Sequence, residues 1–400
     1  MRIVLLLPLA ALLQGCASAA PRLVVSHVGV VDVEAGATRP DQSVVIRGGR
    51  IERVDAAEKV HVRRGERVID GTGKYLVPGL WDMHVHADTG DLAALLDHGV
   101  TGARDMGGDL DSLRAWRRRI SAGTLRGPRL VFAGPQLAGA PATDSRSRRV
   151  IATPGDAVRA VDSLLAAGAD FIKVWEGIPR DALFAAAREA RARRVPFVGH
   201  VPDSATPGEV SDSGQASIEH LELVPPACLV LFDPRAIAAR TPPPPGCGAE
   251  AMDSLLRRLA ANGTALDPTL GSFRLWAPAA FREGILEGFR RLVPLIRRNG
   301  LLVLAGSDLG TRGIEPGASL HDELDLLVQA GFSPAEALRA ATLNPARFLH
   351  REDSFGAIRR GAAADLLMLD GDPLADIRNT RRISLILFDG RVVPPPPRGR

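Results

Sequence analysis

The segment PGLWDMHVH, residues 78–86, is an apolar run that ends in two histidines separated by one residue. Its composition predicts a buried β-strand near 80–86, and alternation along a strand places residues i and i+2 on the same side. His84 and His86 are therefore expected to point together at the end of this strand. With nine histidines in 400 residues, chance alone supplies about 0.2 such pairs. Taken by itself, the motif is therefore equally consistent with two metal ligands and with two histidines that only pack in the core.

Downstream of this segment, apolar strands alternate with amphipathic helices. Further strands are expected near residues 100–105, 129–134, 170–175, 196–200, 216–220, 264–269 and 302–308. Helices are expected between them, for example at 155–167, 180–193, 250–262 and 281–298. This alternation predicts an α/β fold, and its strands fit a closed (β/α)8 TIM-like barrel better than an open doubly wound sheet. No Gly-x-Gly-x-x-Gly turn follows the first strand, which disfavours a dinucleotide-binding fold.

The two ends of the chain differ from this middle, since both read as short β-strands separated by turns. Examples are residues 23–25, 28–31, 43–47, 364–369 and 383–390. We therefore expect the ends to meet in one small β-sandwich domain. Its two parts are residues 16–78 and 350–400, and the barrel comprises residues 79–349.

Polar residues stand at the C-terminal ends of further predicted strands, which is where barrel enzymes carry their chemistry. They are Lys173, His200, His220 and Asp308. Lysine occurs three times in the chain, and one copy is kept inside the apolar run FIKVW. Burying these groups without a metal or a counter-charge would cost several kcal/mol. Together with the histidine pair of the first strand, they predict a metal site at the barrel mouth.

These motifs resemble the amidohydrolase superfamily. The resemblance is carried by PGLWDMHVH at 78–86, Lys173, Gly199-His200, Ile218-Glu219-His220 and Gly306-Ser307-Asp308, with 99–105 and 364–366 beside them. It is greatest for the branch of imidazolonepropionase-like proteins and prolidase-type dipeptidases. It implies a metal-dependent hydrolase that cleaves a carbon–nitrogen bond, in an amide or a cyclic amide, by attack of a metal-bridging hydroxide.

In binuclear members of the superfamily, the matching lysine is carbamylated and bridges two divalent metals. The resemblance therefore assigns His84, His86 and the carbamate of Lys173 to the first metal. It assigns His200, His220 and the same carbamate to the second. Zinc fits imidazole and oxygen ligands best, although manganese, iron or cobalt could substitute. A buried lysine beside two dications is disfavoured as an ammonium, so its neutral amine can take up CO2.

Asp308 has two interpretations. The resemblance implies that it contacts the first metal, takes the proton of the attacking water and passes it to the leaving group. The alternative is that Asp308 caps a helix after the last strand. If Asp308 is not the base, the other candidates at the mouth are Asp267, Glu222 and His321.

Substrate contacts are expected from Asp267, Trp175 and His321. Asp267 could instead cap a helix, and His321 could instead lie at a helix start. The neighbours Arg104 and Asp105 are expected to form a structural ion pair.

Two departures from the dipeptide-cleaving relatives bear on the activity. Those relatives often carry Gly-Gly-His after strand three, whereas residues 134–140 read GPQLAGA, and Trp175 stands where relatives show tyrosine. A metallo-dipeptidase (prolidase-like) or an esterase-type activity at the same site therefore ranks second. A catalytically silent binding lipoprotein ranks third.

Residues 1–15 are expected to be a lipoprotein signal peptide. An apolar stretch at 3–13 is too short to span a bilayer, and LQGC at 13–16 resembles a bacterial lipobox with Cys16 as the lipid anchor. The alternative is a plain secretory signal with an incidental cysteine. The sequence thus predicts an exported, membrane-anchored lipoprotein that faces the periplasm or the cell exterior.

Export would place Cys228 and Cys247 in an oxidising compartment, where we expect a disulfide across the proline-rich insertion at 241–246. This insertion follows strand six and is expected to shape the rim of the pocket. The formal charge of +4 comes from scattered arginines rather than from one basic face, which argues against a nucleic-acid partner. A small-molecule substrate is the expected partner, and the oligomeric state is left open.

Overall fold

The barrel is built from parallel strands that follow one another along the chain. The computed structural model describes residues 22–277 and 279–394. Its barrel strands are β6 (Leu80–Val85), β7 (Val100–Asp105), β8 (Arg129–Phe132), β11 (Ile172–Val174), β12 (Phe197–Gly199), β13 (Gln215–Glu219) and β14 (Ala265–Asp267). Strands β6 to β8 form one sheet and β11 to β14 belong to a second, which β9 (Gln136–Ala138) and β10 (Arg148–Val150) extend. The two sheets meet where the backbone N–H of Asp170 donates to the carbonyl of Phe132 at 2.8 Å.

The segment expected to be the eighth strand, near 302–308, closes the ring without forming a regular strand. It pairs through isolated bridges, Val303 with Leu266 and Leu309 with Val85. This segment lies close beside β6, because a Cβ on Gly306 would lie 2.5 Å from the Cβ of His84. The predicted barrel is therefore confirmed, and its last strand is corrected to an extended, irregular segment.

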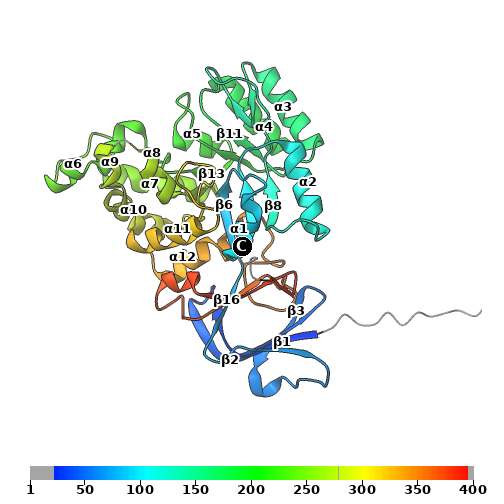
Figure 1. The fold of residues 1–400 in the computed structure, drawn as a ribbon. Coiled ribbons are helices and arrows are strands. Elements are labelled where there is room, and N and C mark those ends of the chain that lie inside the picture. The colour runs from blue at the N-terminus through cyan, green and yellow to red at the C-terminus, as the bar shows by residue number, and fades with distance from the viewer. Residues whose placement is uncertain (1–21, 278, 395–400) are drawn as a thin grey trace, which may run out of the picture.

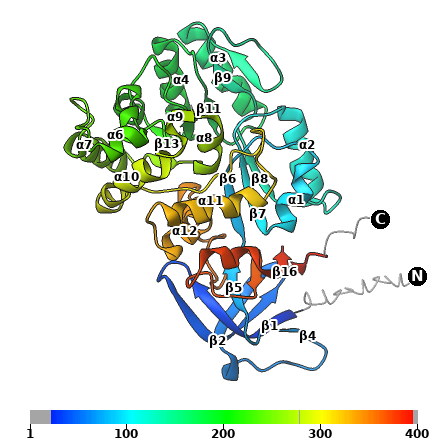
Figure 2. The ribbon, with the colours of Figure 1, turned by 60° about the vertical axis from the view of Figure 1, so that its left-hand side comes forward.

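Helices surround the barrel (Figures 1 and 2). They are α1 (Asp91–Asp97), α2 (Leu110–Ser121), α3 (Pro154–Ala166), α4 (Arg180–Ala192), α5 (Pro207–Asp212), α7 (Ala249–Ala261), α8 (Leu270–Trp276), α9 (Ala279–Arg282), α10 (Ile285–Asn299), α11 (Ala318–Gln329), α12 (Pro334–Ala340) and α13 (Leu343–Phe348). Helix α3 shows why such starts are readable in sequence, since Thr153 and Asp156 form a capping box around Pro154. The expected helix at 281–298 is interrupted at Glu283 and Gly284, so it becomes α9 and α10.

The two ends of the chain join in a small β-domain, seen in Figure 1 as blue and red strands beneath the barrel. Its strands are β1 (Arg22–Asp32), β2 (Ala37–Arg47), β3 (Arg50–Ala56), β4 (Arg67–Asp70), β5 (Tyr75–Pro78), β15 (Leu366–Leu369), β16 (Ile383–Phe388) and β17 (Arg391–Val392), with 3₁₀ turns η1 (Ala57–Lys59) and η3 (Ile377–Arg381). Strand β15 pairs antiparallel with β5, so hydrogen bonding runs continuously from the N-terminal to the C-terminal part. The domain is consequently one mixed sheet of eight strands, where the sequence suggested a sandwich.

The insertion after β13 contains η2 (Pro226–Phe232) and α6 (Pro234–Ala238). The expected disulfide between Cys228 and Cys247 is present and ties η2 to the segment before α7. The expected signal peptide and Cys16 lie outside the described residues. Within the described part of the chain, no helix has both the length and the apolar character needed to span a bilayer.

Candidate metal centre

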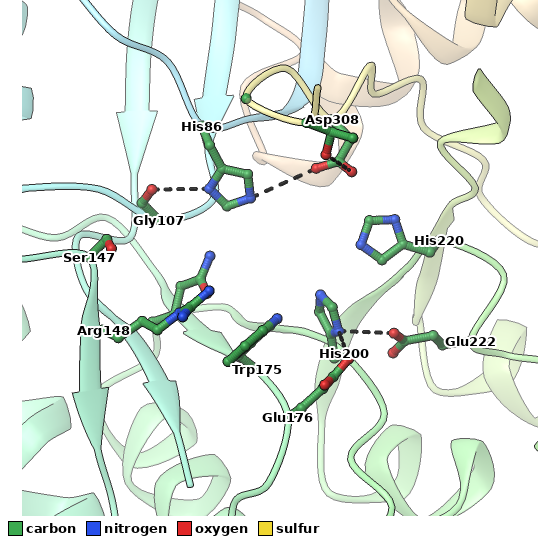
Figure 3. A pocket seen from close by; sticks show the side chains of 13 residues that line it. His86, Gly107, Ser147, Arg148, Trp175, Glu176, His200, His220, Glu222 and Asp308 are labelled. Atoms are coloured by element: carbon green, nitrogen blue, oxygen red, sulfur yellow. Dashed lines mark hydrogen bonds and ion pairs between the residues drawn. The ribbon is translucent and has the colours of Figure 1, made fainter. Parts of the chain in front are cut away.

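Four histidines from three strand ends lie close together at the mouth of the barrel, and three of them, His86, His200 and His220, line one cavity there (Figure 3). The ring centroids of His84 and His220 are 4.9 Å apart, and those of His200 and His220 are 5.0 Å apart. His86 joins the group, with its ring centroid 5.4 Å from that of His84. The adjoining cavity has a volume of about 410 Å³. The structure thus brings together all four histidines that the sequence predicted as ligands.

Left-handed backbone conformations at His220 and Asp308 orient the side chains of these two residues. His220 has a φ of 56° and Asp308 a φ of 60°, values that are uncommon for residues other than glycine. In a regular strand the neighbours Glu219 and His220 would point to opposite sides. The turn at His220 instead lets both reach toward His84. Backbone strain of this kind costs of order 1–3 kcal/mol and is typical of functional sites.

Asp308 faces the first pair of histidines. Its Oδ1 lies 3.5 Å from Nε2 of His84 and 3.9 Å from Nε2 of His86. Its Oδ2 accepts hydrogen bonds from the hydroxyls of Ser272 and Thr311. Burial opposes ionisation of Asp308, but the nearby imidazoles outweigh it and hold its pKa below the usual value. The next helix, α11, begins ten residues later at Ala318, so Asp308 is not a helix N-cap.

Lys173 lies at the centre of β11 and is fully buried. Among the described residues, its Nζ has no hydrogen-bond partner. Burial lowers the pKa of Lys173, although the charges of Glu219 and Glu222 oppose this shift. Strand β12 packs this closely against β11 only because residue 199 is glycine. A Cβ at this position would lie 2.2 Å from the carbonyl oxygen of Val174. The structure therefore places a lysine with a lowered pKa beside the histidines.

Each of the four histidines has a second residue beside Nδ1, through a hydrogen bond for His84, His86 and His220 and through an ion-pair contact for His200. The pairs are His84 with Oε2 of Glu219 at 3.1 Å, His86 with the carbonyl of Gly107 at 3.0 Å, His200 with Oε1 of Glu222 at 2.9 Å and His220 with the hydroxyl of Thr269 at 2.6 Å. Engaging Nδ1 fixes the ring and leaves Nε2 available as a metal ligand. Burial also lowers the pKa of His220 to about 4, which favours the neutral imidazole that metals bind.

These donors fit divalent metal ions. The ligand atoms of His84, His86 and Asp308 lie within 4.8 Å of one another, as do those of Glu176, His200 and Glu222. In the described structure, Nε2 of His84 and Nζ of Lys173 are buried without a hydrogen-bond partner. Such atoms are costly to bury unless something binds them. Imidazole nitrogens and carboxylate oxygens are ligands that zinc and its first-row neighbours accept.

The sequence model of the Amidohydrolase family matches residues 75–393. The chain belongs to the amidohydrolase family. This membership confirms the resemblance that the sequence motifs carried, and the match covers the barrel with β5 and the C-terminal strands of the small β-domain.

Solved structures and curated proteins agree with the family assignment. A provisionally assigned prolidase from Bifidobacterium longum is 26% identical, with a TM-score of 0.77 over 96% of this chain and 97% of that one. A Xaa-Pro dipeptidase with bound methionine is 21% identical, with a TM-score of 0.74 over 93% of this chain and 99% of that one. Adenine deaminase from Rubrobacter xylanophilus is 24% identical over 93% of this chain, which spans 57% of that protein's length. Imidazolonepropionase from Salmonella heidelberg is 34% identical over 27% of this chain and 26% of its own length.

One wall of the amidohydrolase cavity is formed by Gln136, Ser147, Arg148 and Trp175. The guanidinium of Arg148 stacks on the Trp175 ring, 3.9 Å from its centroid. In Figure 3 this pair lies across the cavity from Asp308. Trp175 is therefore positioned as the sequence predicted, and Arg148 is a cavity residue that the sequence analysis did not identify.

Asp267 and His321 were expected to contact the substrate, but neither residue lines this cavity. Asp267 is fully buried inside the barrel, where its Oδ2 lies 3.3 Å from a guanidinium nitrogen of Arg104. Burial, together with the charge of Glu219, raises its pKa well above the usual value. His321 is buried on α11, with its ring nitrogens 2.9 Å from the Thr380 hydroxyl and 2.9 Å from the His98 carbonyl. Both are structural residues here.

The expected Arg104–Asp105 ion pair is also wrong, because neighbours on β7 point to opposite sides. Arg104 extends into the barrel and pairs with Glu219 at 2.9 Å. Asp105 turns the other way and accepts backbone hydrogen bonds from Ala87 and Gly107. His84, Glu219 and Asp267 also lie close enough together to hold a metal ion. The guanidinium of Arg104 already pairs with both carboxylates of this group.

Glu222 lines the cavity at the mouth, where the sequence placed it as an alternative base. The sequence did not indicate which residues hold the ligands. Glu219, Glu222 and Thr269 support histidines, and Arg104 supports Glu219. A partial signal was present, since Glu219 and Glu222 flank His220 in the sequence. Their partners His84 and His200 come from other strands, so the pairing itself was not readable.

Proposed function

We propose that this amidohydrolase cleaves the carbon–nitrogen bond of an amide or a cyclic amide and uses two divalent metals, with zinc the best match to the donors. His84 and His86 would hold the first ion, and His200 and His220 the second. A carbamate on Lys173 would join both. The observation that carries the proposal is the partnerless, buried Nζ of Lys173 beside four histidines that are all oriented through Nδ1.

Lys173 is suited to carbamate formation because its burial favours the neutral amine. The lone pair of Nζ bonds to the carbon of CO2 and one amine proton is released, which leaves a carboxylate-like group. That group would add a negative charge beside the imidazoles.

Metal ions bound at this site would lower the pKa of water and polarise the substrate carbonyl. Asp308 supplies the proton transfer, since two hydroxyls hold its Oδ2 and its Oδ1 faces the imidazoles. It takes the proton of the attacking water and returns it to the departing amine. Arg148 and Trp175 contact the remainder of the substrate from the opposite wall.

A metallo-dipeptidase activity is the second candidate, and Arg148 is the observation that favours it. Among the described residues, no carboxylate pairs with its guanidinium, which lines the cavity and can bind a substrate carboxylate. The overall similarity to prolidase structures points the same way.

The test separates the proton carrier from the metal ligand. Asp308→Asn should keep most of the metal yet lose several orders of magnitude in turnover, because an amide does not accept the proton. Lys173→Ala should lose metal and activity together, and short carboxylic acids should restore part of both. The assays are elemental analysis and hydrolysis of a panel of amides, lactams, N-acyl amino acids and dipeptides.

Asp322→Asn is the matched control, because Asp322 is an exposed aspartate on α11 that pairs with Arg381. It should retain both metal and turnover. A fully active Asp308→Asn, or a Lys173→Ala protein that keeps both metals without added acid, contradicts the mechanism.

A further inference from the structure

A second cavity adjoins the candidate active site. It has a volume of about 220 Å³, and Glu176 and Glu222 line both cavities. Eight of its ten lining residues are apolar, among them Leu221, Val224, Leu229, Phe232, Phe273 and Phe281. These residues come from the segment after β13, from η2, and from α8 and α9. The metal-binding cavity therefore opens beside a cavity of opposite character.

The η2 side of this apolar cavity is closely packed. Phe232 is 1% exposed and packs onto α10, where a Cβ on Gly288 would lie 2.1 Å from its Cδ1. A glycine at 288 is thus required for this close packing. On the other side of η2, the Cys228–Cys247 disulfide fixes the segment covalently. A cavity held in this way is preformed, which reduces the entropy cost of binding.

Leu229 forms an exposed part of the wall. Its side chain is 37% exposed, although fully burying a leucine is worth about 1.5–3 kcal/mol. The other large apolar side chains with comparable exposure in the described part of the chain are Val62, Val68 and Leu275. Of these four, Leu229 lines the apolar cavity beside the metal centre. An apolar ligand group seated there would cover it.

We propose that the apolar cavity binds a bulky apolar group of the substrate, an aromatic ring or a branched aliphatic chain, while the scissile amide lies at the metal centre. The inference rests on the hydrolase function proposed above and names its substrate class. The volume supports a side-chain subsite, because cavities that enclose a whole small ligand measure about 300–1,000 Å³. The occupant follows from adjacency, since Glu176 and Glu222 line both cavities.

The test uses binding probes that need no turnover. Acetate, phenylacetate, 3-phenylpropionate and 4-phenylbutyrate are titrated into the metal-loaded full-length protein by calorimetry. The best phenyl acid should bind roughly tenfold to a hundredfold more tightly than acetate, as expected for burying one aromatic ring. Leu229→Glu should remove most of this preference and leave acetate binding unchanged. Leu229→Trp keeps the surface apolar but fills the cavity, so it should also weaken the phenyl acids.

Leu275→Glu is the matched control, because Leu275 is an exposed leucine on α8 that does not line the apolar cavity. It should bind the acids like the unaltered protein. Phenyl acids that bind no better than acetate, or a preference that survives both Leu229 variants, would overturn the proposal. Self-association that Leu229→Glu abolishes would assign the surface to a second copy and overturn it as well. If the unaltered protein prefers the phenyl acids but hydrolyses none of the amides tested, the proposed function is refuted and the apolar cavity proposal is not.

Discussion

Arg104→Met removes the positive charge at the centre of the barrel while keeping a long, unbranched side chain. Arg104 is fully buried and donates hydrogen bonds to Ser217, Glu219 and the carbonyl of Met83. It also lies 3.3 Å from Asp267. The variant therefore leaves two buried carboxyl groups without their cation. Glu219 in turn orients His84, so both stability and metal binding should respond.

The magnitude follows from the geometry. Removing one partner of a buried ion pair costs about 3–5 kcal/mol, because the other charge stays buried and unpaired. Asp267 limits the cost, since its raised pKa lets it remain protonated. We expect a loss of about 4 kcal/mol in the free energy of unfolding, and a metal affinity that is roughly 10- to 100-fold weaker because Glu219 no longer holds His84 firmly.

Urea denaturation of the metal-free protein measures the first effect without interference from metal loss, and metal titration measures the second. Arg114→Met is the control, because its ion pair with Asp111 is exposed and worth about 0.2–1 kcal/mol. Adding Glu219→Gln and Asp267→Asn to Arg104→Met should recover part of the stability, since no buried charge is then unpaired. An Arg104→Met protein as stable as the Arg114 variant, with unchanged metal affinity, would refute this reasoning.

Four further predictions concern the metals, the anchor, the disulfide and pH. Elemental analysis of protein prepared with ample metal should find close to two divalent ions per chain; trace amounts reject a metal site, and a value near one favours a mononuclear site. Cys16→Ser should release the protein from the membrane fraction or leave it unprocessed, whereas unchanged fractionation and mass exclude a lipid anchor. Reducing the Cys228–Cys247 bond should lower stability by about 3 kcal/mol without abolishing catalysis, because neither cysteine is a proposed ligand. Burial raises the pKa of Glu323 from 4.5 to about 8, so between these two pH values the folded state binds a proton that the unfolded state has lost. The free energy of unfolding should therefore fall as the pH rises from 4.5 to about 8. Glu323→Gln should reduce this pH dependence in denaturation curves.

Much of the fold was predictable because local patterns report local geometry. Alternating apolar strands and amphipathic helices indicated the barrel, and the bounds of α3 and α4 came within one residue of the expectation. The eighth strand was less predictable, since its apolar run resembles the others. It lies close beside the first strand at Gly306, a contact that no local pattern records.

The predicted metal ligands came together at the barrel mouth for a related reason. Parallel strands of a barrel all end at the same face, so a polar residue at each strand end reaches the same place. His84, His200, His220 and Asp308 could therefore be chosen from their positions alone. Trp175 follows Lys173 at the end of β11 and lines the cavity on the same logic.

The sequence by itself thus determined the barrel, its closing β-domain and the residues at its mouth, because strand ends and periodicity are local properties of the chain. Only the tertiary structure decided which residues support those at the mouth. Arg104 and Glu219 are 115 residues apart, and His321 is bound by Thr380, 59 residues away. Pairings across such distances depend on which strands and helices pack together, and on side chains such as Arg104 turning inward where Asp105 turns outward. Packing of the whole barrel therefore made Arg104, Asp267 and His321 structural residues, and it placed an apolar cavity beside the metal centre.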